Sequence, residues 1–423
     1  MRTGGEDRRR VLFLTPQLPY PPEQGTAIRN YNLIRHVASR HDVALLSFVH
    51  GDGKHVDLGP LEEICFSLST VPAPARSLGD RLRTLLTTRD PDMAHRLRAS
   101  KFTSALKEVL TRDPPDLVQV EGIEMAPYIP MMRRWLGQAC PPILFDDHNA
   151  EYVLQRRAWE SDLPRPRRWP AALYSFIQWR RLVRYERSVC RWADDVVVVS
   201  EADARAVGRL LPALSPLVVP NGVDVKRYHP QLADSLPLRH PAVVFTGKMD
   251  FRPNVDAMVW FYERVWSLVR DAVPDVHLYV VGKSPHTRLS SLVQDPAVTI
   301  TGYVEDILPY FGGADVYVVP LRVGGGTRLK VLEAMAAGLP LVSTPLGAEG
   351  ISLIPGTHAL LADTPAEFAQ AVCFLLEDVE KQRALGRAAR EFVRQHYDWR
   401  QIVPRLQPLY DALMGGETTP VSA

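Results

Sequence analysis

Short apolar runs rich in β-branched residues alternate with longer amphipathic stretches along most of this chain. Runs of the first kind are expected to be buried strands of a parallel sheet, because helices cover both faces of such a sheet. In the first half the predicted strands are Val11–Thr15, Val43–Phe48, Leu117–Val120, Ile143–Asp146 and Val196–Ser200, with a weaker signal at Val71. The predicted helices there are Ala27–Arg40, Phe102–Thr111 and Leu173–Trp192. This order implies parallel strands joined by right-handed crossovers.

The same rhythm restarts after a proline-spaced stretch, residues 218–241, which contains a turn signal at Asn221-Gly222 and is predicted to be a linker. The strands predicted after it are Val243–Thr246, His277–Val281, Val298–Thr301, Val316–Pro320 and Pro340–Ser343. The helices predicted there are Ala257–Asp271, Lys330–Ala337, Ala366–Leu376 and Val379–Gln395. We therefore predict an α/β protein with two doubly wound, Rossmann-like domains, residues 1–217 and 242–395. Ligands of such sheets bind at the carboxyl ends of the strands, and the cleft between two domains is the expected site.

Composition fits this organisation, because 423 residues exceed the usual size of one hydrophobic core. The apolar content of 46% and the charged content of 23% are those of an ordinary soluble globular protein. The four cysteines are far apart and lack CxxC spacing, which argues against zinc and fits a reducing cytoplasm. The N-terminal apolar run is too short for a signal peptide, and no apolar run is long enough to span a membrane.

The segment LRVGGGTRLKVLEAMAAGLP, residues 321–340, places a glycine-rich turn and a helix start directly after a predicted strand. Glycines let backbone N–H groups approach a ligand, and the first turn of a helix offers unpaired N–H donors. Lys330 adds a point charge, and Glu333 can accept hydrogen bonds from sugar hydroxyls. The pattern fits a phosphate or another anion. A helix-capping turn with a solvated lysine and glutamate would have the same spacing.

Two other loops at strand ends also combine glycine with a cation. One holds Gly25 and Thr26 before a helix that carries Arg29, and the other, TGKMDFRPN, holds Lys248, Arg252 and Asn254. Facing each other across a cleft, these loops would bind a diphosphate. The alternative is that their cations are ordinary solvated loop charges.

The segment DDHNAE, residues 146–151, places His148 at the carboxyl end of a predicted strand. An imidazole there can hydrogen-bond a substrate hydroxyl, although a lone histidine is more often structural. Asp146 and Asp147 suggest a metal pair, but two adjacent carboxylates without further ligands are weak evidence, so we predict no metal site. No pattern indicates a Ser-His-Asp or Cys-His arrangement.

Together, several segments resemble the retaining GT-B glycosyltransferases of family four. They are LTPQLPYPPEQGTAIRNYNLIRHVA, FDDHNAEY, VVPNGVD, FTGKMDFRPNVDA, TGYVED and GGGTRLKVLEAMAAGLPLVSTPLGAEG, within residues 10–412. The chain looks closest to the sugar transferases of exopolysaccharide or PEP-CTERM-associated gene clusters. The resemblance implies two Rossmann-like domains that face a cleft, the first on the acceptor side and the second binding the nucleotide sugar. It also implies a C-terminal helix, residues 396–415, that crosses back to the first domain.

The resemblance further implies transfer from a nucleotide-sugar donor without a metal ion or another cofactor. Glu333 matches the second glutamate of the family's E-x7-E motif, which binds the nucleotide ribose. The first glutamate, which holds the donor sugar, is replaced by Gly325, so backbone amides around Gly325–Thr327 are expected to substitute. The predicted donor-binding residues are Gly25, Thr26, Arg252, Asn254, Val304, Gly325, Gly326, Thr327 and Glu333, and the predicted catalytic residues are His148, Lys248 and Lys330.

The family's arginine–lysine pair for the diphosphate is only partly matched. Lys248 takes the place of the arginine, whereas the register of the lysine gives Arg252, Pro253 and Asn254 nearby, so Lys330 is expected to supply the missing charge. The resemblance also implies that His148 lies near the donor sugar and that Gly25 belongs to the loop that approaches the diphosphate.

Residues 156–191 hold ten arginines against three acidic residues, with Trp159, Trp169 and Trp179 interleaved. Arginine with interfacial aromatic residues fits docking on an anionic membrane surface. The alternative is a charged helix that covers the first domain and places its tryptophans in the core. No motif indicates a nucleic-acid partner.

These features lead us to expect a cytoplasmic enzyme, peripheral at the inner face of the cell membrane. It would transfer sugar to a glycan or lipid-linked acceptor in surface polysaccharide biosynthesis. One alternative is a nucleotide-sugar 2-epimerase of the same architecture, which would need clustered acid and base side chains. Another is a non-catalytic nucleotide-sugar-binding protein, which the glycine at position 325 makes plausible.

Overall fold

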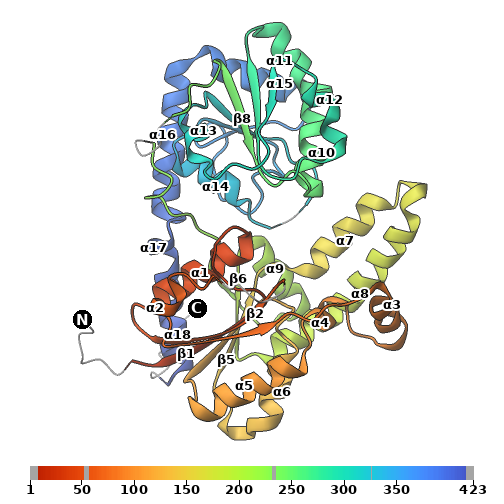
Figure 1. Ribbon diagram of the computed structural model, residues 1–423, viewed down its shortest axis with the longest axis vertical. Helices are drawn as coiled ribbons and strands as arrows, with labels where there is room; N and C mark the ends of the chain where they lie inside the picture. The colour runs from red at the N-terminus through yellow and green to blue at the C-terminus, as the bar shows by residue number, and fades with distance from the viewer. Residues whose placement is uncertain (1–7, 52–56, 231–234, 325, 416–423) are drawn as a thin grey trace. The chain divides into compact units, whose positions relative to one another are not determined.

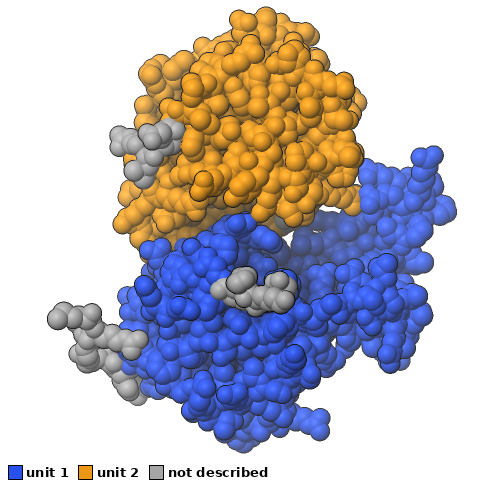
Figure 2. All heavy atoms as spheres, in the orientation of Figure 1, with its two compact units in different colours: residues 1–220, 403–423 blue, residues 221–402 orange. Residues whose placement is uncertain are grey.

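The computed structural model describes residues 8–51, 57–230, 235–324 and 326–415. The chain divides into two compact units (Figure 2). Unit 1 comprises Met1–Pro220 and Val403–Ala423, and unit 2 comprises Asn221–Ile402. The boundary after Pro220 falls within the stretch 218–241. Each unit contains one parallel sheet, so the fold is the predicted pair of Rossmann-like domains.

Unit 1 is built on a parallel sheet with the strand order β3-β2-β1-β4-β5-β6-β7. Its strands are β1 (Arg10–Thr15), β2 (Asp42–Val49), β3 (Ser67–Pro72), β4 (Leu117–Glu121), β5 (Ile143–Asp147), β6 (Asp195–Val198) and β7 (Leu217–Val218). Every residue of β4 and β5 is buried, as expected for strands with helices on both faces. Burial on both faces explains why the other positions of these strands are apolar, while Gln119 within β4 and Glu121, Asp146 and Asp147 at the carboxyl ends of the two strands are buried polar residues.

Helices cover both faces of this sheet, although not every helix of unit 1 packs on it (Figure 1). They are α1 (Gly25–Val37), α2 (Leu61–Ile64), α3 (Leu78–Thr87), α4 (Met93–Arg96), α5 (Ser100–Arg112), α6 (Tyr128–Leu136), α7 (Glu151–Asp162), α8 (Trp169–Trp192) and α9 (Glu201–Leu210). Phe102 of α5 stacks on Phe48 of β2 with ring centroids 4.3 Å apart, and lies 4.6 Å from the ring of Tyr128. Such aromatic pairs each add about 0.5–1.5 kcal/mol beyond the burial of their area.

Unit 2 is built on a second parallel sheet, with the order β10-β9-β8-β11-β12-β13. Its strands are β8 (Ala242–Thr246), β9 (His277–Val281), β10 (Val298–Ile300), β11 (Val316–Val319), β12 (Leu341–Ser343) and β13 (Leu360–Leu361). Its helices are α10 (Arg252–Phe261), α11 (Ser267–Ala272), α12 (Ser290–Val293), α13 (Leu308–Gly312), α14 (Leu329–Ala336), α15 (Pro365–Glu377), α16 (Val379–His396) and α17 (Trp399–Ile402). In Figure 1, α10 and α11 lie on one side of β8, whereas α14 and α16 lie on the other. A π-helical turn over Tyr262–Trp266 joins α10 to α11.

The C-terminal segment returns to unit 1 in short helical pieces. After α16 and α17, a 3-10 turn over Val403–Leu406 leads into α18 (Gln407–Leu413). The expected single helix over 396–415 is therefore interrupted. Tyr410 of α18 is only 1% exposed, and its hydroxyl donates a hydrogen bond to Gln119 of β4. The returning segment thus anchors itself in the core of unit 1.

The strand order of each sheet reverses between two neighbouring strands. In unit 1 this switch point lies between β1 and β4, and in unit 2 it lies between β8 and β11. Parallel α/β sheets bind ligands outside the carboxyl ends of the strands at such points. Each unit therefore has one place where a site is expected.

Several helices differ from the sequence-based expectation, since α8 begins at Trp169 instead of Leu173 and α2, α3, α4, α6, α9, α12 and α13 were not predicted. Helix α10 begins at Arg252 instead of Ala257, because Pro253 occupies the first helical turn, where proline is well tolerated. Helix α7 was not predicted, and its only buried residue is Asp162. It packs on the longer α8, and in Figure 1 the two helices extend away from the sheet of unit 1 as an arm.

Candidate functional site

Lys330 lies at the switch point of unit 2, in the first turn of α14. Its Nζ donates to the carbonyl oxygen of Thr246, the last residue of β8, at 2.7 Å. It also donates to Oδ1 of Asn254 in α10 at 2.8 Å. Burial lowers the pKa of Lys330 to about 7. The amine is therefore held at the carboxyl edge of the sheet by groups from β8 and α10.

Gly247, the residue after β8, leaves the space that Lys330 occupies. Its φ of +155° lies in the region that favours glycine, and a Cβ there would lie 2.7 Å from Lys330 Nζ and from Asn254 Nδ2. Any larger residue would displace the lysine or the asparagine. The glycine that the sequence places beside Lys248 thus makes room for Lys330.

The glycine-rich turn before α14 adopts a conformation that suits glycine. Gly324 and Gly326 have φ angles of +115° and +76°, and Gly325 lies outside the described residues. No side chain caps the start of α14. Thr327 Oγ1 is buried and has no hydrogen-bond partner among the residues that the structure describes. An uncapped helix start and an unpartnered hydroxyl can both bind the oxygens of an anion.

Glu333 lies one turn after Lys330 on the same helix and therefore on the same face. Its Oε1 accepts a hydrogen bond from the hydroxyl of Tyr228 at 3.0 Å. Burial raises the pKa of Glu333, and the hydrogen bond from Tyr228 and the charge of Lys330 oppose that rise. Tyr228 thus orients the carboxylate on which the ribose assignment depends.

The other cations predicted in unit 2 are more exposed than Lys330. Lys248 is about half exposed, and its Nζ lies 3.3 Å from Oδ2 of Asp250. Arg252 is the exposed first residue of α10. Asn254 is 6% exposed and donates to the carbonyl oxygen of Lys248 at 2.9 Å. Asn254 therefore positions both the loop that carries Lys248 and the side chain of Lys330. Val304 lies half-buried in the loop after β10.

The switch point of unit 1 is occupied by a buried ion pair. Arg29 of α1 is 1% exposed and Asp146 of β5 is fully buried. The guanidinium donates to both oxygens of Asp146 at 2.8–3.0 Å, and also to the carbonyl oxygen of Val219 at 3.0 Å. Such a fork-to-carboxylate pair fixes both groups. Arg29 therefore ties α1 to β5 and to the chain that leaves β7.

A hydrogen-bonded chain of side chains leads from α18 to His148. The hydroxyl of Tyr410 donates to Gln119, and Gln119 Nε2 donates to Glu121 Oε1 at 2.6 Å. Glu121 Oε2 lies 2.8 Å from His148 Nε2. Burial lowers the pKa of His148, but the hydrogen bond to Glu121 and the charges of Asp146 and Glu121 outweigh burial and raise it. The chain thus favours a protonated His148.

Glu121, Asp146 and His148 each have a possible metal-ligand atom within 4.8 Å of the others. The donor atoms are already engaged, because Arg29 donates to both oxygens of Asp146 and Glu121 binds Gln119 and His148. A cation there would also meet the guanidinium charge. We therefore assign these residues to the hydrogen-bond network.

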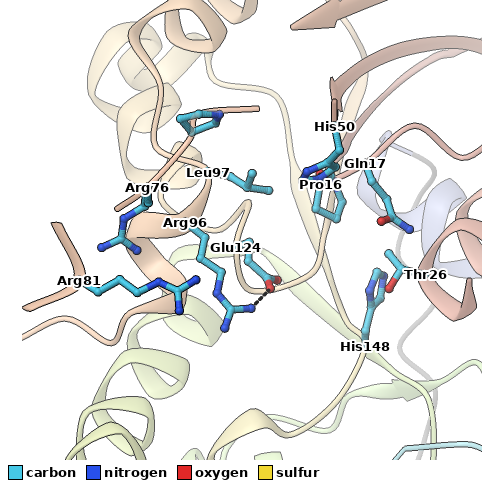
Figure 3. Close-up of a pocket in the computed structure, with 11 residues that line it drawn as sticks. Pro16, Gln17, Thr26, His50, Arg76, Arg81, Arg96, Leu97, Glu124 and His148 are labelled. Atoms are coloured by element: carbon cyan, nitrogen blue, oxygen red, sulfur yellow. Dashed lines mark hydrogen bonds and ion pairs between the residues drawn. The ribbon is translucent and has the colours of Figure 1, made fainter. Parts of the chain in front are cut away.

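His148 and Thr26 line a cavity of about 320 Å³ in unit 1 (Figure 3). Thr26 lies in the first turn of α1, directly after Gly25, the first residue of that helix. The side chain of His148 is 14% exposed, whereas that of its partner Glu121 is buried. His148 is therefore the member of the chain that a ligand in the cavity can reach.

Two family models match most of the chain between them. The model described as Glycosyltransferase Family 4 matches residues 24–227, and the model described as Glycosyl transferases group 1 matches residues 240–378. The chain belongs to glycosyltransferase family four. The sequence resemblance to this family is thereby confirmed.

Named relatives are similar at low identity. An uncharacterized 44.6 kDa protein in the cps region of Klebsiella pneumoniae is 21% identical over 54% of this chain and 59% of its own length. A GDP-mannose-dependent alpha-(1-6)-phosphatidylinositol monomannoside mannosyltransferase of Mycobacterium tuberculosis is 30% identical over 50% of this chain and 60% of its own length. This chain spans about three fifths of the length of these curated relatives.

The fold is also that of a solved structure. Sucrose-phosphate synthase from Thermosynechococcus elongatus superimposes with a TM-score of 0.70 at 21% identity, covering 96% of this chain and 99% of that chain. At this identity the likeness establishes the GT-B fold alone.

The structure brings some of the predicted residues of this family-four protein together within each unit. In unit 2, Lys330 and Asn254 are in direct contact, and Glu333 lies on the same face of α14 as Lys330. In unit 1, His148 and Thr26 share a cavity. Sequence reasoning missed Glu121, Gln119 and the pairing of Arg29 with Asp146. The available signal was the presence of two polar residues, Gln119 and Glu121, in the otherwise apolar run LVQVE.

Proposed function

We propose that this chain is a retaining, metal-independent glycosyltransferase that moves a sugar from a nucleotide-sugar donor to a glycan or lipid-linked acceptor. The observation that carries the proposal is the position of Lys330. It is held at the carboxyl end of β8 at the switch point, in the first turn of an uncapped helix that follows a glycine-rich turn. Retention is inferred from membership of the family.

The reaction needs positive groups where negative charge grows. As the bond between the sugar and the diphosphate breaks, the leaving diphosphate gains charge. Lys330 and backbone N–H groups around Gly326 and Thr327 are suited to stabilise it, and Lys248 can add a second charge from the adjacent loop. One preorganised donor of this kind is typically worth about 3–4 kcal/mol.

The remaining predicted residues take roles around that diphosphate. We assign Glu333, oriented by Tyr228, to the ribose hydroxyls of the donor. We assign Arg252 and Val304 to the periphery of the donor and Asn254 to positioning Lys330. In unit 1, Gly25 and Thr26 begin α1 and can offer N–H groups to the donor, while His148 would hydrogen-bond the sugar. No cofactor is required by these assignments.

We further propose a role in surface polysaccharide biosynthesis, as for the sugar transferases of exopolysaccharide or PEP-CTERM-associated gene clusters. A relative encoded in a cps region supports this assignment. The name of the mycobacterial relative includes a phosphatidylinositol mannoside, which supports a lipid-linked acceptor.

The arm formed by α7 and α8 supports contact with an anionic membrane surface, in a revised form. Trp159 and Trp179 stack on each other with centroids 5.3 Å apart, so they hold the two helices together. Trp169 and Leu173 remain 59% and 61% exposed, and Arg180 and Arg184 are exposed beside them on α8. Among the described residues, no helix has the length and hydropathy needed to cross a bilayer. We propose a cytoplasmic protein that docks peripherally through this arm.

Vesicle sedimentation tests the docking. Arg181 should be left intact, because it donates to the carbonyl oxygens of Leu85 and Asp90. A variant with Arg180→Gln and Arg184→Gln should bind phosphatidylglycerol vesicles more weakly at low salt than wild type does. The control, with Arg40→Gln and Arg134→Gln, makes the same charge change elsewhere on unit 1. Equal binding by all three proteins would contradict docking through the arm.

Donor hydrolysis tests the proposed activity. Wild-type protein is incubated with UDP- and GDP-sugars without acceptor, and release of the nucleoside diphosphate is measured. A transferase should release it slowly, because water replaces the acceptor. Conversion of a UDP-N-acetylhexosamine to its 2-epimer would instead identify an epimerase. Binding without either reaction would identify a non-catalytic nucleotide-sugar-binding protein.

A further inference from the structure

The cavity beside His148 follows the carboxyl edge of the sheet of unit 1. Its lining includes residues that follow β1, β2, β3, β4 and β5 in turn: Gln17, His50, Arg76, Glu124 and His148. Ligands of parallel sheets bind along this edge. His148 therefore lines the same cavity as residues that follow strands at the other side of the sheet.

The end of the cavity away from His148 is strongly basic. Arg76, Arg81 and Arg96 line it together (Figure 3). Glu124 is the acidic residue that lines the same cavity, and its Oε1 lies 3.4 Å from Arg96. Among the described residues, the Arg81 side chain makes no hydrogen bond or ion pair. Asp92 is a second acid beside these arginines, since its oxygens lie 2.9 Å from Arg76 Nη1 and 3.6 Å from Arg96 Nε. Three arginines therefore face two carboxylates, which leaves an excess of positive charge.

The orientation of Arg76 is fixed before any ligand arrives. Its Nη1 donates to Asp92 Oδ1 at 2.9 Å, and its Nη2 donates to Thr84 Oγ1 at 2.9 Å. Asp92 is 7% exposed, and its backbone N–H donates to Gln178 Oε1 at 2.8 Å. A guanidinium held in this way loses little freedom when it binds an anion.

The number of cations favours a phosphate over a carboxylate. Guanidinium groups bind both anions through paired N–H donors. A phosphate offers more oxygens and more charge than one carboxylate, and three arginines can use them. Helix α3, which carries Arg81, also exposes Leu78, Leu82 and Leu86 at 82%, 57% and 76%. These leucines recur at intervals of four residues and form an apolar stripe beside the basic end.

We propose that this cavity is the acceptor site and that Arg76, Arg81 and Arg96 bind a phosphate group of the acceptor. The acceptor hydroxyl would then lie toward His148. This inference rests on the proposed glycosyltransferase function and adds the chemical class of its acceptor. The phosphate can belong to a lipid or to a phosphorylated glycan, and the leucine stripe favours the lipid.

Calorimetric titration of the full-length protein with hexyl phosphate and with glycerol 1-phosphate tests the proposal. Arg81→Gln and Arg96→Gln should each weaken binding of the preferred probe by about tenfold or more, because each removes a charged donor. The matched control is Arg83→Gln, on the same helix but outside the cavity lining, and it should bind as wild type does. Equal affinity in all four proteins would overturn the proposal.

The two probes distinguish the source of the phosphate. Tighter binding of hexyl phosphate supports a lipid phosphate, and equal binding of both supports a phosphorylated glycan. Failure of this proposal is separable from failure of the proposed function, because donor hydrolysis by wild type is measured without any acceptor phosphate. If wild type hydrolyses the donor but Arg81→Gln and Arg96→Gln bind both phosphate probes as wild type does, the acceptor site alone is rejected.

Discussion

At the switch point of unit 1, Arg29 and Asp146 fill the edge of the sheet with a buried ion pair. At the switch point of unit 2, Gly247 leaves space and a single lysine occupies it. The two sheets share a parallel, doubly wound topology. The difference therefore lies in the side chains at the strand ends, because each sheet has a switch point of the same kind.

The charged groups at the two switch points therefore have different roles. In unit 1 the charges are paired inside the protein, and His148 is the member of the network that reaches a cavity. In unit 2 the amine of Lys330 is held by neutral oxygens, from Thr246 and Asn254. Among the described residues, the amine of Lys330 has no carboxylate bonded to it, whereas the guanidinium of Arg29 is already engaged by both oxygens of Asp146. We therefore expect the diphosphate at unit 2.

The largest effect is expected from breaking the ion pair of unit 1. Arg29→Met should destabilise unit 1 by about 3–5 kcal/mol, because it leaves the buried carboxylate of Asp146 without its partner. Hydrogen exchange with mass spectrometry should show faster exchange in β1, β4 and β5 but not in β8. Arg112→Met, which removes an exposed arginine of the same unit, should leave these rates unchanged. Unchanged exchange in Arg29→Met would mean that the pair is not structural.

The next largest effect is expected at the lysine of unit 2. Lys330→Ala should lower kcat/KM for donor hydrolysis by about tenfold to a thousandfold, because it removes a preorganised charge from the leaving group. Lys381→Ala on α16 is the control for a lysine elsewhere in the unit. Circular dichroism should verify that both variants fold. Wild-type turnover by a folded Lys330→Ala protein would contradict the assigned role.

A third effect is expected at Glu333 of unit 2. Glu333→Gln keeps the shape of the side chain and an oxygen for Tyr228, but removes the charge that would bind the ribose. Donor affinity should fall by about 1.5–3 kcal/mol. Tyr228→Phe should have a smaller effect, since it removes only the orienting hydrogen bond. A folded Glu333→Gln protein with unchanged nucleotide affinity would refute the ribose assignment.

The smallest effect is expected at Glu186, a buried acidic residue of unit 1 that, unlike Asp146, is not paired with Arg29. Glu186 is 1% exposed, and burial together with the charge of Asp147 raises its pKa. A raised pKa in the folded state contributes stability that is complete in acid and is lost as pH rises through that pKa. Glu186→Gln cannot ionise and should keep the acceptor for the Tyr152 N–H.

The melting temperature of Glu186→Gln should therefore exceed that of wild type increasingly as pH rises from 5 to 9. A gain of about 1 kcal/mol corresponds to about 2–4 °C for a unit of this size. Thermal melts across that pH range measure the difference. A constant difference from pH 5 to pH 9 would show that the pKa of Glu186 is not raised in the folded state.

The positions of most strands could be predicted because buried parallel strands are mostly apolar runs, whereas β7 and β13, of two residues each, were missed. The glycine-rich turn and Lys330 could also be found, since a triple glycine before a helix is a local pattern. The contacts of Lys330 could not, because Thr246 and Asn254 lie 84 and 76 residues away in the sequence.

The same limit applies to unit 1. Arg29 and Asp146 are 117 residues apart, and neither residue alone indicates a partner. Helix α7 was missed because it packs on α8 instead of burying an apolar stripe against the sheet. Local patterns thus predict elements and turns, whereas pairings between distant charges depend on the assembled fold.

Calorimetric binding of UDP, GDP and their nucleosides to wild type and Lys330→Ala tests whether the diphosphate binds beside Lys330. We expect wild type to bind one of the diphosphates much more tightly than the matching nucleoside. We expect Lys330→Ala to lose most of that advantage while its nucleoside affinity stays the same, because a nucleoside carries no phosphate. An equal diphosphate advantage in the two proteins would contradict the assignment of the diphosphate to the switch point of unit 2.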